Sequence, residues 1–266
     1  MIVNEYFKEK HKNYFKFMLF LLFLITQFNA FAQEVLDNII TEELSKEQLW
    51  AIALTGIMSE RNRSNNSTLS TSWTDYRYRA VWLEVLRRDW GITTREELLE
   101  TLDDMENYGH AGSLEYIKSI ILEKNVVIYE IDENNVLVTT ELDFHYLSIR
   151  GYNYLVFTYS NWDLLSNRTI LAWDLGRNIA LCRWGYDVGF LSEEEAWEKI
   201  MYYARIIQPL YNSWEEYGYD YYIGRVFWAS GFGEENRYNE ETIPIYEKLI
   251  NRNGLWYNLE WNIDLK

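Results

Sequence analysis

The chain has 266 residues, of which 48% are hydrophobic and 17% aromatic, with only two Pro and one Cys. Its formal net charge of −16 predicts a surface that repels nucleic acid and anionic lipid. The single cysteine, Cys182, excludes an intramolecular disulfide, and its position in an apolar helical run predicts a buried thiol rather than a nucleophile.

The first 32 residues have the pattern of a secretory signal peptide. Four lysines precede an apolar core from Phe17 to Ile25, and the tripeptide Ala-Phe-Ala at 30–32 ends the segment. The core is shorter than the roughly 20 residues of a membrane span. We therefore expect cleavage before Gln33, export to the periplasm or beyond, and a mature chain that does not span the membrane. An uncleaved anchor is the alternative.

Helix starts are the strongest local signal in the rest of the chain. In a capping box, a Ser or Thr hydroxyl accepts from the amide three residues on, and a Glu or Gln there reaches back. The sequence predicts such boxes at 45–48, 94–97, 192–195 and 213–216, each followed by apolar residues at helical spacing. The same spacing predicts further helices over 74–90, 113–123, 168–188 and 241–251.

Three segments differ from this helical pattern. Residues 126–143 are rich in β-branched side chains around a polar turn and predict a β-hairpin. Residues 144–160 fit a helix or a strand, and the Ser- and Asn-rich residues 61–73 predict a mobile loop. Together the elements predict an all-α protein of about eight helices. We expect them to form one compact domain over 33–266, with a small hairpin-like insertion near 126–143.

Several short motifs, in one order, resemble the bacterial domain of unknown function family 1266. They are ALTGI at 53–57, WGITxREELL at 90–99, GH at 109–110, AWDLGR at 172–177, RWGYDVGFLSEEEAW at 183–197, SWEE at 213–216, YxxGRxxW at 221–228 and LWYNLEW at 255–261. The resemblance covers most of the mature chain and implies a mostly helical fold, but no particular activity. The segment 126–143 departs from the family pattern and is expected to be particular to this protein.

Asp174 and Arg177 are the charged pair within the most apolar helical run. They are three residues apart and therefore share a helix face. A charge pair in a packed helix is tolerated when both members are satisfied, which predicts a buried salt bridge, with Arg225 or Glu97 as further partners. The alternative is a polar cleft in which Asp174 is an acid or base and Arg177 holds an anion.

Four other residues are candidates for the same site. His110 follows a helix-ending glycine, so its ring is expected to cap the carbonyls of that end; it is also the best candidate for proton transfer. Arg225 follows Gly224 among aromatic residues and is expected to stack on one of them. Trp173 and Trp214 are core residues in the simplest interpretation and binding residues in the alternative.

Function is constrained mainly by what the sequence lacks. It contains no HExxH, GxSxG, P-loop or GxGxxG motif, and we predict neither a metal nor a cofactor. The acidic, aromatic-rich composition favours a module that binds a basic protein in the envelope, as an immunity protein does. The alternatives are an envelope hydrolase acting on glycan or peptidoglycan through a carboxylate and histidine site, and a self-associating scaffold.

Overall fold

The computed structural model describes residues 44–265 except for 72–76, 125, 133–134 and 140–147. The expected signal peptide therefore lies outside the described residues. In chain order the helices are α2 (Lys46–Ala53), α3 (Gly56–Asn62), α4 (Arg77–Val85), α5 (Arg95–Tyr108), α6 (His110–Glu123), α7 (Ile149–Ser160), α8 (Trp162–Leu165), α9 (Leu171–Val188), α10 (Glu193–Ile207), α11 (Trp214–Ser230) and α12 (Glu235–Ile250). The all-α class is confirmed, and none of these helices is long and apolar enough to cross a membrane.

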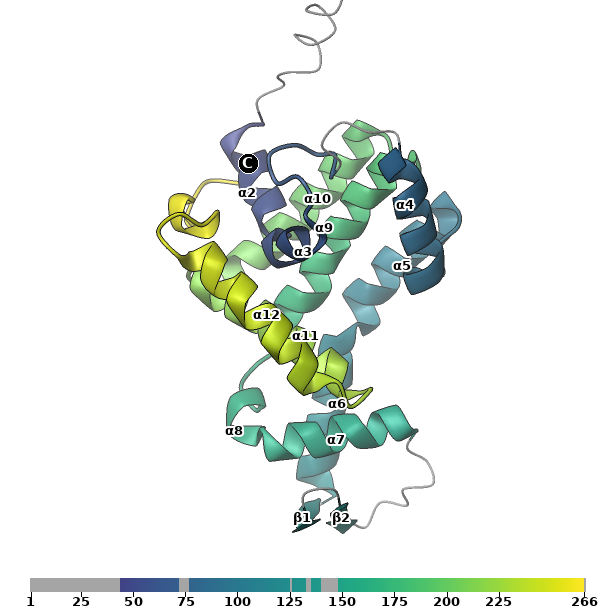
Figure 1. Ribbon diagram of the computed structural model, residues 1–266, viewed down its shortest axis with the longest axis vertical. Helices are drawn as coiled ribbons and strands as arrows, with labels where there is room; N and C mark the ends of the chain where they lie inside the picture. The colour runs from purple at the N-terminus through teal and green to yellow at the C-terminus, as the bar shows by residue number, and fades with distance from the viewer. Residues whose placement is uncertain (1–43, 72–76, 125, 133–134, 140–147, 266) are drawn as a thin grey trace, which may run out of the picture. The chain divides into compact units, whose positions relative to one another are not determined.

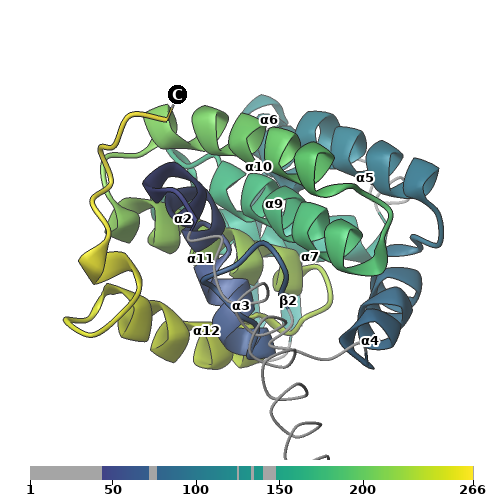
Figure 2. The same ribbon diagram turned by 90° about the horizontal axis from the view of Figure 1, so that it is seen from above.

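Helix α9 is the centre of the fold. Every residue from Ala172 to Gly185 is buried, because α4, α5, α10 and α11 pack around it (Figure 2). A helix that is covered on all sides is expected to be apolar throughout, so its few charged residues have to find partners inside the protein. Close packing depends on glycine: a Cβ on Gly224 of α11 would lie 2.4 Å from the Cβ of Trp173. The absence of a side chain at Gly224 therefore lets α11 approach α9 closely.

The hydrophobic core has two parts. The larger one surrounds α9 and includes an aromatic cluster in which Trp214 packs against Trp50, Trp256 and Trp261. The smaller one lies between α6, α7 and α11, where Tyr154 stacks on Phe227. Figure 1 shows α6 and α7 together at the end of the helical domain that also carries the strands.

Local sequence determined the starts of α2, α5, α10 and α11. The capping boxes at Ser45, Thr94 and Ser192 are complete, as predicted. The fourth is only half formed: Ser213 accepts from the amide of Glu216, but the Glu216 carboxylate accepts from Asn212 instead of reaching back to the cap. Ser213 is thus an N-cap, in agreement with its simplest interpretation.

Other segments differ from the expectation or refine it. The ambiguous residues 144–160 contain helix α7, and α12 begins at Glu235 rather than near 241. Strands β1 (Val127–Asp132) and β2 (Asn135–Thr139) pair antiparallel, whereas 133–134 and 140–143 of the expected insertion lie outside the described residues.

Residues 63–71 lie outside the helices, in agreement with the loop predicted at 61–73, and they are bonded to one another and to α9. The amide of Asn65 donates to the carbonyl of Thr71, and Asp187 of α9 accepts from the hydroxyl of Ser70 and the amide of Thr71. Arg183 donates to several carbonyls of the same loop. Polar composition indicated a loop, but hydrogen bonds to α9 hold it in place.

Candidate functional site

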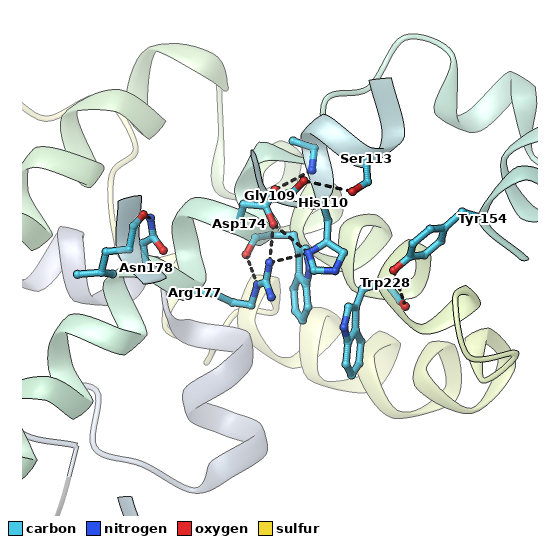
Figure 3. Close-up of polar contacts among 11 residues, drawn as sticks. Gly109, His110, Ser113, Tyr154, Asp174, Arg177, Asn178 and Trp228 are labelled. Atoms are coloured by element: carbon cyan, nitrogen blue, oxygen red, sulfur yellow. Dashed lines mark hydrogen bonds and ion pairs between the residues drawn. The ribbon is translucent and has the colours of Figure 1, made fainter. Parts of the chain in front are cut away.

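The polar cluster of α9 lies where α5 meets α6. Figure 3 shows Asp174 and Arg177 on α9 directed toward Gly109 and His110 at this corner. Gly109 ends α5 and is also the N-cap of α6, so two helices change direction at one residue. The predicted contact between Asp174 and Arg177 is therefore present, and His110 is the third member of the cluster.

Asp174 replaces a missing helix cap. Gly109 has no side chain to accept from the first amides of α6, and Asp174 Oδ2 accepts from the amide of Ala111 at 2.7 Å. A Cβ on Gly109 would lie 2.4 Å from that same oxygen. Glycine at 109 is therefore required by the close approach of the carboxylate, which performs the capping from another helix.

The second oxygen of Asp174 is also occupied. Oδ1 accepts from Arg177 Nη2 at 2.5 Å, and the aspartate side chain is only 1% exposed. Burial by itself would raise the pKa of Asp174, but the Arg177 charge and the hydrogen bond from the Ala111 amide oppose it, and the pKa is lowered. The carboxylate is held in its charged form, and both of its oxygens already accept from groups of the protein.

Arg177 is held on several sides. Its Nε donates to the carbonyl of Trp173 at 3.1 Å, and its guanidinium carbon lies 4.2 Å from the centre of the Trp173 ring. Trp90 belongs to the π-helical turn Leu86–Trp90 that continues α4, and the centre of its ring lies 5.6 Å from the Arg177 guanidinium carbon. The guanidinium thus combines an ion pair with two aromatic neighbours, an arrangement that stabilises a buried cation.

The contact with Arg177 favours one tautomer of His110. Its Nδ1 lies 3.0 Å from Arg177 Nη2 and 3.5 Å from Asp174 Oδ1. Because a guanidinium can only donate, Nδ1 has to accept, and the ring is neutral with its proton on Nε2. Burial lowers the pKa of His110, and the Arg177 charge adds to this although Asp174 opposes it. The expected capping of helix carbonyls by this ring is replaced by the contact with Arg177.

The cluster is poorly arranged for acid–base catalysis. A catalytic histidine accepts a proton at one nitrogen while a carboxylate orients the other, but here an arginine occupies Nδ1 and the exposed edge of the ring carries the proton. Most glycoside hydrolases use two carboxylates, and among the described residues Asp174 is the only carboxylate that contacts the cluster. Among the described residues no group of His, Cys, Asp and Glu is suited to hold a metal ion.

The other predicted site residues lie elsewhere. Arg225 is buried on α11, pairs with Glu241 of α12 at 3.2 Å, and lies 5.0 Å from the ring of Tyr238, so the expected aromatic stacking is confirmed. Glu97 is part of its capping box, and neither it nor Arg225 joins Asp174. Trp214 lies in the core, where its Nε1 donates to the carbonyl of Leu259. Trp173 alone joins the cluster.

A family model matches residues 85–261, about two thirds of the chain, and this range includes every member of the cluster. The chain belongs to the family described as protein of unknown function (DUF1266). Two proteins of Escherichia coli strain K12 are similar to it. The uncharacterized protein YbeU is 29% identical over a match that covers 61% of this chain and 64% of YbeU. The uncharacterized protein YbeR is 28% identical over a match that covers 65% of this chain and 69% of YbeR.

This DUF1266 chain therefore spans just under two thirds of YbeU. No solved structure matches it. The comparisons establish the family, whereas function has to be argued from the residues.

Sequence reasoning missed a second buried polar site on α9. Arg183 is 1% exposed, and its Nη1 donates to the hydroxyls of Thr55 at 2.9 Å and Ser59 at 3.2 Å. Its other nitrogens donate to backbone carbonyls of the loop between α3 and α4, namely those of Asn65, Thr68 and Leu69. A charged residue within an apolar helical run was the available signal, the same one that singled out Asp174.

Asp220 of α11 is a further buried acid, and the sequence pattern did not distinguish it from the aromatic residues around it. The hydroxyl of Tyr211 donates to its Oδ2 at 2.6 Å, and Arg168 lies 3.8 Å from Oδ1. Burial raises the pKa of Asp220, although Tyr211, nearby backbone amides and Arg168 oppose the shift. The Tyr211 hydroxyl also accepts from the amide of Ala172 at the start of α9, so this group stabilises a helix end.

Proposed function

We propose that this chain is an exported, non-catalytic module that captures a protein with a basic surface. The observation that carries the proposal is the acidic face of α5, formed by Glu96, Glu100, Asp103 and Asp104. All four side chains are exposed, and no ion pair joins them to another described residue. Spacings of three and four residues place them on one side of the helix.

An aromatic residue extends this face. Tyr108 follows Asp104 by one helical turn and is 79% exposed. A tyrosine gives a partner a large apolar surface with a polar end, and this residue type is enriched at protein interfaces. The acidic face therefore provides both long-range attraction for a basic surface and a contact that acts at short range.

The polar cluster supports binding over turnover. Both oxygens of Asp174 accept from the protein and His110 is held as a neutral acceptor from Arg177, so the groups that a hydrolase would use are committed to the fold. The exposed carboxylates of the acidic face of α5 form no ion pair with another described residue. We assign the recognition role to the surface and the stabilising role to the cluster.

Export is part of the proposal, because the leader at 1–32 has the order of a cleavable signal peptide. Determination of the N-terminus of the protein isolated from the envelope tests it. The expected first residue is Gln33. Recovery of the chain with an intact leader in the membrane fraction would contradict cleavage.

The binding function is tested by co-purification of tagged full-length chain from native envelope extract. We expect a stoichiometric partner with a basic surface, released as salt is raised because exposed charges are screened. The triple variant Glu100→Gln, Asp103→Asn, Asp104→Asn should lose this partner.

A matched control separates the α5 face from net charge. The triple variant Glu123→Gln, Glu240→Gln, Glu247→Gln removes the same charge from exposed positions on α6 and α12, and should retain the partner. Equal loss by both variants, or no companion with the unaltered chain, would contradict the proposal.

A further inference from the structure

A polar pocket of about 590 Å³ lies between α7 and the turn that joins α11 to α12. In Figure 1 the middle of α7 crosses this end of α11 and α12. The pocket is distinct from the acidic face of α5 and from the Asp174 cluster, whose residues do not line it. Its volume falls in the range of small-molecule sites.

Three of the side chains that line the pocket donate hydrogen bonds to the fold. Asn153 donates through Nδ2 to the carbonyl of Gly231 at 3.3 Å, and Asn161 does so to the carbonyl of Phe157 at 2.9 Å. Ser230 donates its hydroxyl to the carbonyl of Phe227 at 2.7 Å. Because carbonyl oxygens only accept, these contacts fix the amide orientations and leave both Oδ1 atoms as acceptors.

A carboxylate in the same wall has no partner. Glu235, the first residue of α12, lines the pocket, and its Oε2 is shielded from solvent without a hydrogen bond from any described residue. The start of a helix favours its negative charge, but no described cation pairs with it. No Lys or Arg lines the pocket. The pocket therefore combines amide oxygens and a negative charge with the hydroxyls of Tyr152 and Ser160, and it has no lining cation.

Phe157 adds an aromatic wall to this set of acceptors. A flat cation with several N–H donors matches both features, since it can bond amide and carboxylate oxygens and lie against an aromatic ring. We propose that this pocket binds an alkylguanidinium group, carried by a small molecule or by an arginine side chain. Anionic ligands are disfavoured by Glu235 and by the absence of Lys and Arg from the lining.

Calorimetric titration of the full chain with propylguanidinium and with propylurea tests the proposal. The two probes have similar shape, but only the first is charged. We expect propylguanidinium to bind at least tenfold more tightly than propylurea, and Glu235→Gln to remove most of that difference. Glu240→Gln, an exposed substitution on the same helix outside the pocket, should bind like the unaltered chain.

A blocked Gly-Arg-Gly peptide distinguishes the two sources of the group. Tighter binding of the peptide than of propylguanidinium assigns the pocket to an arginine of a protein, and weaker binding assigns it to a small molecule. Equal affinity for the two propyl probes, no saturable binding, or unchanged binding by Glu235→Gln would each overturn the proposal. These outcomes do not depend on the partner proposed for α5.

Discussion

Arg177 and Arg183 lie on the same central helix and are both almost fully buried, yet their charges are satisfied in different ways. Arg177 has a carboxylate one turn away, an imidazole and two aromatic rings. Among the residues that the structure describes, the direct partners of Arg183 are hydroxyls and backbone carbonyls. Burial lowers the pKa of Arg183 to about 10, against the opposing effect of Asp187, so it is still charged at neutral pH.

The difference shows what each arginine does for the fold. Arg177 joins α9 to the corner between α5 and α6, and its counter-charge is local in sequence. Arg183 joins α9 to α3 and to the loop that follows it, more than one hundred residues away in the chain. The first partner was predictable from spacing, whereas the second required the tertiary structure. The predictions below test whether the two sites differ in this way.

The largest effect is expected at Arg183. Substitution by Met keeps much of the volume but leaves two buried hydroxyls and three carbonyls without their donor, each of which is costly inside a protein. We expect a loss of about 4 kcal/mol in the free energy of unfolding, measured by urea denaturation. Arg183→Lys retains the charge but not the several N–H donors of the guanidinium, so its free energy of unfolding should lie between those of the unaltered chain and of Arg183→Met. A loss below about 1 kcal/mol would show that the loop does not depend on Arg183.

Asp174→Asn should cost about 3 kcal/mol, because it leaves a buried guanidinium without its counter-charge. The double variant Asp174→Asn, Arg177→Met removes both charges and should be less destabilised than the sum of the single variants by roughly 1 kcal/mol or more. Urea denaturation of all four proteins completes the cycle. Strict additivity would mean that the two side chains are not coupled.

Gly109→Ala should cost about 2 kcal/mol, since its Cβ would overlap Asp174 and displace the carboxylate from α6. The matched control is Gly112→Ala, three residues on in α6. A Cβ there meets nothing within 4 Å, and alanine is the better helix former, so this variant should be as stable as the unaltered chain or slightly more so. If both substitutions have the same effect on thermal unfolding, the close approach is not what requires Gly109.

The smallest effect is a dependence on pH. The pKa of His110 is lowered in the folded protein, mainly by burial, so the unfolded chain binds a proton more readily. The stability from this group is present above its unfolded pKa of about 6.5 and is lost as pH falls through the folded value. Asp174, whose pKa is lowered too, acts in the same direction but below about pH 4.

Urea denaturation between pH 7.5 and 5.0 measures the histidine effect. The unaltered chain should lose stability on acidification in this window, and His110→Gln should lose less, because it has no group there to protonate. A chain whose stability rises as pH falls below 6.5 would indicate that His110 is protonated in the folded state, and would contradict its role as an acceptor from Arg177.

Elements with a local cause were predicted best. Three capping boxes formed as expected because each depends on residues within a four-residue stretch. The box at Ser213 failed on its second half because Asn212 offers Glu216 a nearer amide. The start of α12 was placed late because its first turn is polar and carries no apolar pattern, although Thr242 and Leu249 further along are buried.

The site was predictable only in part for the same reason. The Asp174–Arg177 contact follows from helix geometry, and His110 was a candidate from its motif. That these three residues meet depends on how α5 turns into α6 over Gly109, which no local pattern encodes. The polar pocket beside α7 was missed entirely, because its residues come from two distant segments and include no conspicuous motif.

The central claim is that His110 is a neutral acceptor held by Arg177, and that the cluster stabilises the fold rather than performing catalysis. Nitrogen-15 NMR of the histidine ring at neutral pH, assigned by comparison with His110→Gln, tests it most directly. The account predicts a proton on Nε2, a bare Nδ1 and a pKa below the ordinary value of about 6.5. A proton on Nδ1 facing Asp174, with a raised pKa, would contradict it and would describe an acid–base pair of the kind that enzymes use.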